Sequence, residues 1–195
     1  MKRIAITPEA IHPAEPGAIC AILDHGWDMV HLRHPGADIK SLRDLLDRIP
    51  AALHTRIRLH SCFELTGEYQ LGGIHLNSRN PQPPPGFTGR ISRSCHAISE
   101  LQQSAGFDYV TLSPVFDSIS KNGYRAAFTP EELSAMHFPD TISVIALGGI
   151  NPENARTLRD TPFAGYAVLG YLSEAYGDSL LLEQRLKLFD SCYNS

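Results

Sequence analysis

A double glycine at the end of an apolar run is the first candidate for chemistry in this sequence. Residues 144–147 are apolar and predict a buried strand, which Gly148 and Gly149 follow at once. The Asn-Pro pair at 151–152 can then cap and begin a helix. Because glycine lacks a Cβ, an anion can approach the peptide N–H groups, and the helix adds its positive end. The pattern predicts a phosphate site, and a second apolar run that ends at Gly170 repeats it.

Polar side chains at the ends of other predicted strands supply further candidates. His31 and Arg33 share one face of the strand predicted at 28–33, and the planar guanidinium suits a carboxylate or a phosphate. Other polar residues of this kind are His60, Ser61, His75, Asn77, Ser94 and His96. No His-x-His or His-Glu-x-x-His spacing occurs, so the sequence gives little support to a histidine-bound metal.

The connection after the strand predicted at 109–112 combines hydroxyls with a cation. Ser118 and Ser120 precede Lys121, and the segment 113–125 has neither a helical nor a strand pattern. These groups can wrap a phosphate or diphosphate, and the segment can close over it as a lid. The alternative is a solvated loop in which serine, asparagine and glycine only make turns. The clustering of hydroxyls and a cation favours the functional interpretation.

Composition favours a small-molecule ligand over a large partner. The 195 residues carry a net charge of −4 with 17 Lys plus Arg, and no basic run suggests nucleic acid or a membrane surface. The four cysteines are far apart, which argues against a disulfide framework and a thiolate metal site. Without a signal peptide or a membrane span in the pattern, we expect a cytoplasmic protein with one domain, residues 1–195.

Short apolar segments alternate with helical patterns along the chain. The predicted strands are 2–7, 28–33, 56–60, 73–76, 90–94, 109–112, 142–147 and 165–169. The predicted helices are 17–25, 39–49, 64–71, 98–105, 130–137, 152–159 and 180–189. Between the fourth and fifth strands, four prolines within 81–85 exclude a helix.

This alternation predicts an α/β fold with a parallel sheet covered by helices. We expect a compact, closed (β/α)8 barrel in which a proline-rich loop replaces the helix after strand four. In such a barrel the chemistry lies at the carboxyl ends of the strands. A doubly wound open sheet is the alternative, disfavoured because no Gly-x-Gly-x-x-Gly follows the first strand.

Several motifs together resemble the family of thiamin phosphate synthase and its relative, the TenI-type thiazole tautomerase. They are Val30-His31-Leu32-Arg33, Gly73-Ile74-His75-Leu76, Ser94-Cys95-His96, Ser113-Pro114-Val115-Phe116 with Lys121, and Ala146-Leu147-Gly148-Gly149-Ile150. The resemblance covers nearly the whole chain and implies a TIM barrel that handles thiazole phosphate in thiamin biosynthesis. In the synthase, an aminopyrimidine diphosphate loses pyrophosphate with help from Mg²⁺, and the thiazole nitrogen captures the resulting cation.

Departures from the family pattern bear on the activity that the resemblance implies. The synthase motif Gln-x-Arg-x-Lys reads His31-Leu32-Arg33-His34-Pro35 here, and histidine at this place is typical of TenI-type proteins. The aspartates that hold Mg²⁺ in the synthase align with Ser61 and Asn80, which leaves the Asn80 amide as the remaining candidate ligand. The histidine credited with proton transfer in the tautomerase is replaced by Pro114.

The resemblance leads us to expect a TenI-like enzyme that acts on thiazole phosphate. The expected substrate- and phosphate-binding residues are Ser94, Ser118, Ser120, Gly148, Gly149 and Gly170. The expected catalytic residues are His31, Arg33 and Lys121, with His31 as the proton shuttle ahead of Cys62 and His60.

Other functions remain open at this point. A thiamin phosphate synthase would join hydroxymethylpyrimidine diphosphate to thiazole phosphate and would need Mg²⁺ as its cofactor. A noncatalytic barrel would bind the phosphorylated ligand without turnover. A sugar-phosphate epimerase is disfavoured because the acidic and histidine metal ligands do not line up. Homo-oligomerisation through apolar residues of the shortened fourth unit is also left open.

Overall fold

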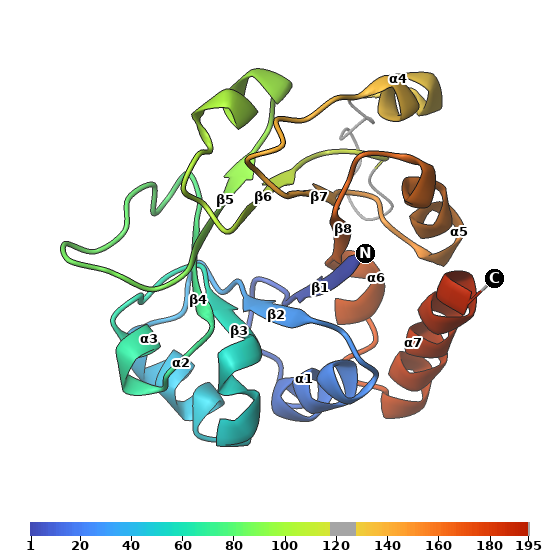
Figure 1. Ribbon diagram of the computed structural model, residues 1–195. Coiled ribbons are helices and arrows are strands. Elements are labelled where there is room, and N and C mark those ends of the chain that lie inside the picture. The colour runs from blue at the N-terminus through green and yellow to red at the C-terminus, as the bar shows by residue number, and fades with distance from the viewer. Residues whose placement is uncertain (118–127, 195) are drawn as a thin grey trace.

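The computed structural model describes residues 1–117 and 128–194, and its centre is a closed barrel of parallel strands (Figure 1). The strands are β1 (Lys2–Ile6), β2 (Met29–Leu32), β3 (Ile57–Leu59), β4 (Gly73–Leu76), β5 (Ile91–Cys95), β6 (Tyr109–Leu112), β7 (Val144–Leu147) and β8 (Gly165–Val168). Each strand pairs with the next, and β1 also pairs with β8. The predicted (β/α)8 barrel is confirmed, and the open sheet is excluded because the ring has no edge strand.

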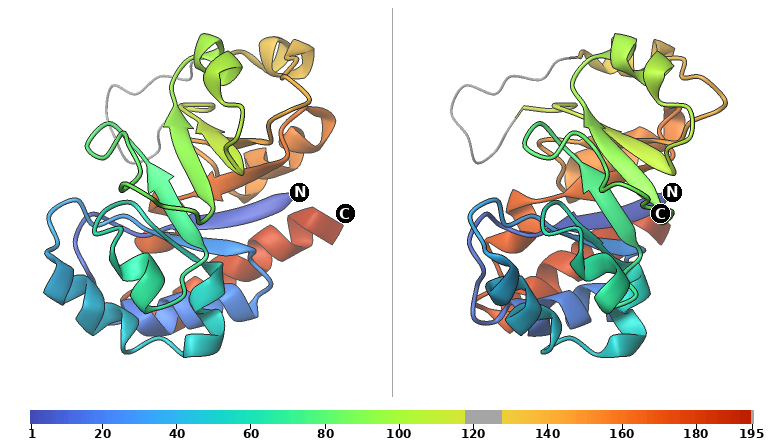
Figure 2. Two further views of the ribbon diagram at one scale, coloured as in Figure 1. Left: turned by 60° about the vertical axis from the view of Figure 1, so that its left-hand side comes forward. Right: turned by 90° about the vertical axis from the view of Figure 1, so that its left-hand side faces the viewer.

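Helices surround the barrel on its outer face (Figures 1 and 2). The α-helices are α1 (Glu15–Asp24), α2 (Ile39–Leu46), α3 (Leu65–Glu68), α4 (Pro130–Ala135), α5 (Pro152–Ala155), α6 (Gly170–Ser173) and α7 (Ser179–Asn194). The 3₁₀ helices are η1 (Ala51–Arg56), η2 (Ile98–Gln103) and η3 (Arg156–Asp160). Within the described residues, none of these helices has the length and apolar character needed to cross a membrane.

The connection between β4 and β5 is a loop, as the prolines predicted. It projects as the green loop at the left of Figure 1, and no helix occurs between its ends. Two turns shape it, closed by Asn80 N–H to the Asn77 carbonyl and by Phe87 N–H to the Pro84 carbonyl. The first residues of this loop, 77–80, line the cavity described below.

One predicted helix is wrong in type and another is confirmed only in its first part, and both differences coincide with local hydrogen bonds from side chains. The segment predicted at 98–105 is the 3₁₀ helix η2, because the Arg93 guanidinium and the Ser104 hydroxyl both bond to the Glu100 carbonyl. The segment predicted at 152–159 divides into α5 and η3, where the Thr157 hydroxyl bonds to the Asn154 carbonyl. Such side chains compete with the regular backbone ladder.

The C-terminal helix α7 closes the outer layer against the first strand–helix unit. Phe189 packs edge-on against the buried Trp27, with ring centroids 5.2 Å apart. Asp190 accepts from the Arg3 guanidinium at 2.6 Å, and His25 lies 2.8 Å from a Glu183 carboxylate oxygen. Apolar packing and ion pairs therefore hold both ends of the chain together.

The interior of the barrel is divided into an apolar and a polar side. Inward-facing residues of β1, β6, β7 and β8 form an apolar cluster of Ile4, Ile6, Tyr109, Ile145 and Ala167. The strands β2 to β5 instead bury polar side chains, namely His31, Arg58, His75 and Ser92. Because alternate residues of a strand face inward, this polar side leads directly to the carboxyl ends of β2–β5.

Candidate active site

A cavity of about 620 Å³, which we call the mouth cavity, opens at the carboxyl ends of the strands. Its polar wall follows β2 to β5 and includes Arg33, His60, Asn77, Ser94 and His96. Its apolar wall is formed by Ile6, Leu147 and Leu169, which end or follow β1, β7 and β8. The cavity therefore suits a ligand with one ring face and several polar or anionic groups.

The predicted site residues fall into three groups in the structure. Those that line the mouth cavity are Arg33, Asn80 and Ser94. Those that lie below it or next to its lining residues are His31, Gly148, Gly149 and Gly170. Ser118, Ser120 and Lys121 lie outside the described residues.

The double glycine brings two backbone segments close together. Gly148 has φ +101° and Gly149 has φ +65°, a region that favours glycine. A Cβ on Gly149 would lie 2.2 Å from the Asp117 carbonyl oxygen, and one on Gly148 would lie 2.8 Å from the Pro114 Cα. The glycines thus have a packing role against the segment after β6, and their predicted role in anion binding stays a prediction.

The helix start after the double glycine is as predicted, but its own capping residue occupies two of its free N–H groups. The Asn151 side chain caps α5 by accepting from the N–H groups of Glu153 and Asn154 at 2.9 and 3.0 Å. Pro152 has no N–H to offer. Two N–H groups of this helix end are therefore already paired with the Asn151 side chain, and the expected contribution of the helix end to a phosphate site stays a prediction.

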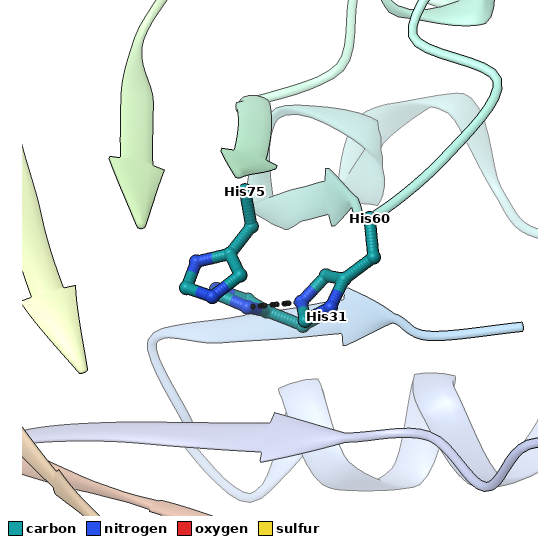
Figure 3. A group of neighbouring side chains, drawn as sticks. All are labelled: His31, His60 and His75. Atoms are coloured by element: carbon teal, nitrogen blue, oxygen red, sulfur yellow. Dashed lines mark hydrogen bonds between the residues drawn. The ribbon is translucent and has the colours of Figure 1, made fainter. Parts of the chain in front are cut away.

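Three histidines from neighbouring strands meet at the floor of the mouth cavity (Figure 3). His31 lies on β2, His75 on β4, and His60 directly follows β3. His31 Nδ1 lies 3.0 Å from His60 Nε2, and the His60 and His75 rings stack with centroids 4.3 Å apart. His60 and His75 line the cavity, whereas His31 is fully buried and bonds through Nε2 to the Tyr109 hydroxyl. We call these three residues the histidine cluster.

The histidine cluster was missed by sequence reasoning because its members are far apart along the chain. The pairing of Arg58 with Gly73 places His60 and His75, each two residues further on, side by side. His31 pairs with Arg58, two residues before His60, and so lies one inward-facing position further from the mouth of the barrel than His60 and His75. The signal in the sequence was a histidine at an inward position of three successive strands, which a search for local spacings does not detect.

Burial keeps the histidine cluster uncharged. Removal from water, reinforced by neighbouring histidines, holds the pKa of both His31 and His60 well below the ordinary value. The same burial, with the nearby Arg58 guanidinium, lowers the pKa of His75 to about 3. All three imidazoles are therefore neutral near pH 7, and each has one N–H and one nitrogen lone pair.

The described lining of the mouth cavity does not fit a protein-bound Mg²⁺. Mg²⁺ prefers carboxylate and phosphate oxygens. The described lining residues include Arg33 and Arg79 but neither aspartate nor glutamate. At the two positions where the resemblance leads us to expect the metal ligands of the synthase, Ser61 offers only a hydroxyl. The Asn80 side chain donates its N–H to the His60 carbonyl at 2.9 Å.

Comparison with known proteins gives a consistent picture. Residues 4–172 match the family described as "Thiamine monophosphate synthase". The thiamine-phosphate synthase of Syntrophomonas wolfei is 33% identical over 172 residues, 82% of each chain. That of Psychrobacter sp. is 26% identical over 184 residues, 86% of each chain.

Solved structures agree with the sequence comparison. The crystal structure of thiamine phosphate pyrophosphorylase from Bacteroides thetaiotaomicron superposes with a TM-score of 0.87 and 34% identity, and it covers 100% of this chain and 98% of its own. The Pyrococcus furiosus thiamine phosphate pyrophosphorylase has a TM-score of 0.77 at 18% identity, with 99% and 95% covered, and is similar in fold.

Proposed function

Because the chain belongs to the thiamine monophosphate synthase family of thiamine biosynthesis, we propose that its mouth cavity binds thiazole phosphate and that its chemistry is TenI-like. The observation that carries this proposal is the cavity's donor set. The described lining combines Arg33, Arg79 and histidines with no carboxylate. This set favours an anionic ligand and offers no support for the Mg²⁺-assisted departure of a diphosphate.

Arg33 is the cation that we assign to the ligand's phosphate. Arg33 lines the cavity, and its guanidinium donates to a Glu9 carboxylate oxygen at 3.0 Å. Glu9 is largely exposed, so this pair contributes little and a phosphate can replace the carboxylate. Gly148, Gly149 and Gly170 are proposed to offer peptide N–H groups from the opposite wall, where Leu147 and Leu169 can pack against the thiazole ring.

Tautomerisation requires a group that takes a proton from one ligand atom and returns it to another. His60 is suited to this because it lines the cavity and its depressed pKa leaves a neutral imidazole. His31 lies below His60 and can act only through the contact between Nδ1 and His60 Nε2. We therefore transfer the proposed proton-transfer role from His31 to His60 and assign His31 as a positioning residue. Cys62 is a poorer base because burial raises the pKa of its thiol.

Synthase activity is the second candidate, and the relatives favour it. The two similar sequences are named thiamine-phosphate synthase, and the 34% identical structure is a thiamine phosphate pyrophosphorylase. Ser94 lines the mouth cavity, where its hydroxyl lies 2.9 Å from His75 Nε2. A synthase of this kind would have to neutralise the diphosphate with Lys121, Arg33 and a metal held mainly by the substrate.

The test of the proposal separates ligand binding from turnover. Calorimetry with thiazole phosphate should show saturable binding that Arg33→Met weakens, and the interconversion of thiazole tautomers should be followed by NMR. We expect His60→Gln to abolish turnover while binding persists, and His137→Gln, a change outside the cavity lining, to preserve both. Binding without turnover in the unaltered protein would instead identify a noncatalytic binder, and absence of binding would refute the proposal.

A further inference from the structure

We propose that His31, His60 and His75 bind one divalent transition-metal ion of the Zn²⁺ class at the floor of the mouth cavity. The inference goes beyond the proposed function and does not depend on it. It rests on the positions and hydrogen-bond partners of three imidazoles, which converge from the neighbouring strands β2, β3 and β4 (Figure 3).

The geometry is close to that of a three-histidine metal site. One ring nitrogen from each residue lies within 4.8 Å of the other two, and the His31 Nδ1 to His60 Nε2 distance is 3.0 Å. Zinc–nitrogen bonds of about 2.0–2.1 Å in a tetrahedron separate the ligand atoms by about 3.3 Å. Ring rotations that move a nitrogen by about 1.5 Å are therefore enough to form the site.

Hydrogen bonds outside the cluster orient His75 as a ligand. The Ser92 hydroxyl donates to the Ile74 carbonyl at 3.3 Å, so its oxygen accepts from His75 Nδ1–H at 2.9 Å. This fixes the tautomer and leaves the lone pair on His75 Nε2, where the Ser94 hydroxyl now donates at 2.9 Å. A metal ion would take the place of that hydroxyl. Ligating histidines typically hold their second nitrogen in this way.

His31 has an equivalent outer partner. Its Nε2 bonds to the Tyr109 hydroxyl, which leaves Nδ1 directed at His60. The Tyr109 phenol is itself protonated, because burial raises its pKa to about 12. With Nε2–H donating to this oxygen, Nδ1 carries the lone pair that a metal requires.

The charges around the cluster set the affinity that can be expected. Burial already keeps the three imidazoles neutral, so no proton has to leave before a metal binds. The Arg58 guanidinium below the cluster opposes a second cation. It is ion-paired with Asp108 and lies 4.5 Å from the centre of the Tyr109 ring, which offsets part of its field. Arg33 adds positive charge on the His60 side.

The fourth coordination position would face the mouth cavity, because His60 and His75 line it. Such an open position is typical of catalytic rather than structural zinc sites. A lone pair on His60 cannot hold a metal and accept a proton at once. Metal-loaded and metal-free protein are therefore distinct species, and the tautomerase experiment above should use chelator-treated protein.

The test uses the untagged full chain, stripped with a chelator and then titrated with Zn²⁺ or Co²⁺ alone. We expect one ion per chain by elemental analysis, a visible Co²⁺ spectrum of a four-coordinate nitrogen site, and a rise in the thermal midpoint with Zn²⁺. Mg²⁺ should not compete, because the site consists of nitrogen donors.

Variants decide whether the cluster is the site. His60→Gln and His75→Gln should each weaken Zn²⁺ binding by at least about 100-fold. His96→Gln is the matched control, since His96 lines the same cavity but bonds to the Ser113 carbonyl outside the cluster. Circular dichroism establishes folding, and His60→Gln serves alone if His75→Gln does not fold. Uptake below one ion per chain, or uptake that His60→Gln leaves unchanged, would overturn the proposal.

Discussion

Replacing Gly149 by alanine tests whether the double glycine is required by the backbone. Gly149 has φ +65°, and a Cβ there would lie 2.2 Å from the Asp117 carbonyl oxygen and 2.8 Å from the Phe116 carbonyl carbon. The left-handed conformation costs alanine about 1–2 kcal/mol. Relief of the contact with neighbouring backbone adds about 1–3 kcal/mol. We therefore expect Gly149→Ala to lower the free energy of unfolding by about 2–5 kcal/mol, a large part of the usual total.

The assay is urea unfolding followed by circular dichroism, with Gly17→Ala as the matched control. Gly17 lies inside α1, and nothing lies within 4 Å of the position its Cβ would take. Alanine there should stabilise the protein by roughly 1 kcal/mol, because it is the better helix former. A loss below about 1 kcal/mol in Gly149→Ala would refute the packing argument, since strain and contact would then both be absent.

Three further predictions concern the ligand and the outer layer. Arg33→Met should weaken thiazole phosphate binding by about 10- to 100-fold in calorimetry, the usual value of a charged hydrogen bond; unchanged affinity would place the phosphate elsewhere. Burial alone would lower the pKa of His25, but its bonds to Glu183 and Asp190 outweigh this and raise the pKa above 6.5. The stabilisation from protonated His25 is complete below the pKa that this side chain has in the unfolded chain, and it is lost as pH rises through the pKa in the folded protein. His25→Gln should therefore flatten the dependence of the unfolding free energy on pH in this range. Trp27→Ala should cost about 3–5 kcal/mol in urea unfolding, because the ring is fully buried; a loss under 1 kcal/mol would contradict that packing.

The barrel was predictable because its signals are local. Short apolar runs alternate with helical patterns, and the prolines within 81–85 mark the loop between β4 and β5. Asn151 was likewise identified as a helix cap from its sequence neighbours alone. The 3₁₀ helix η2 was not predictable from periodicity, because the Arg93 guanidinium that bonds to the Glu100 carbonyl comes from a neighbouring strand.

The site was only partly predictable, because lateral register decides which side chains meet. Arg33 was placed at the cavity from its position at a strand end, and the structure agrees. His31 faces the barrel interior, as predicted from the strand, but it lies further from the barrel mouth than His60. The His60 side chain therefore covers it. The histidine cluster depends on the pairing of β2, β3 and β4, which no spacing within one strand encodes.

The reason for the expected lack of synthase activity can itself be tested. The family resemblance leads us to expect Ser61 and Asn80 at the positions of the magnesium-binding aspartates of the synthase, and the described cavity lining has no carboxylate. Ser61→Asp combined with Asn80→Asp should therefore introduce Mg²⁺-dependent formation of thiamin phosphate. Ser78→Asp in the same cavity serves as the control for added charge alone.

The most direct test of the account is the formation of thiamin phosphate by the unaltered protein. Chelator-treated protein would be mixed with hydroxymethylpyrimidine diphosphate, thiazole phosphate and Mg²⁺, with Lys121→Ala measured in parallel. We predict no product above the level of the variant, while thiazole phosphate still binds. Formation of thiamin phosphate that depends on Lys121 would contradict the account and would identify the protein as a synthase that works without the two carboxylates.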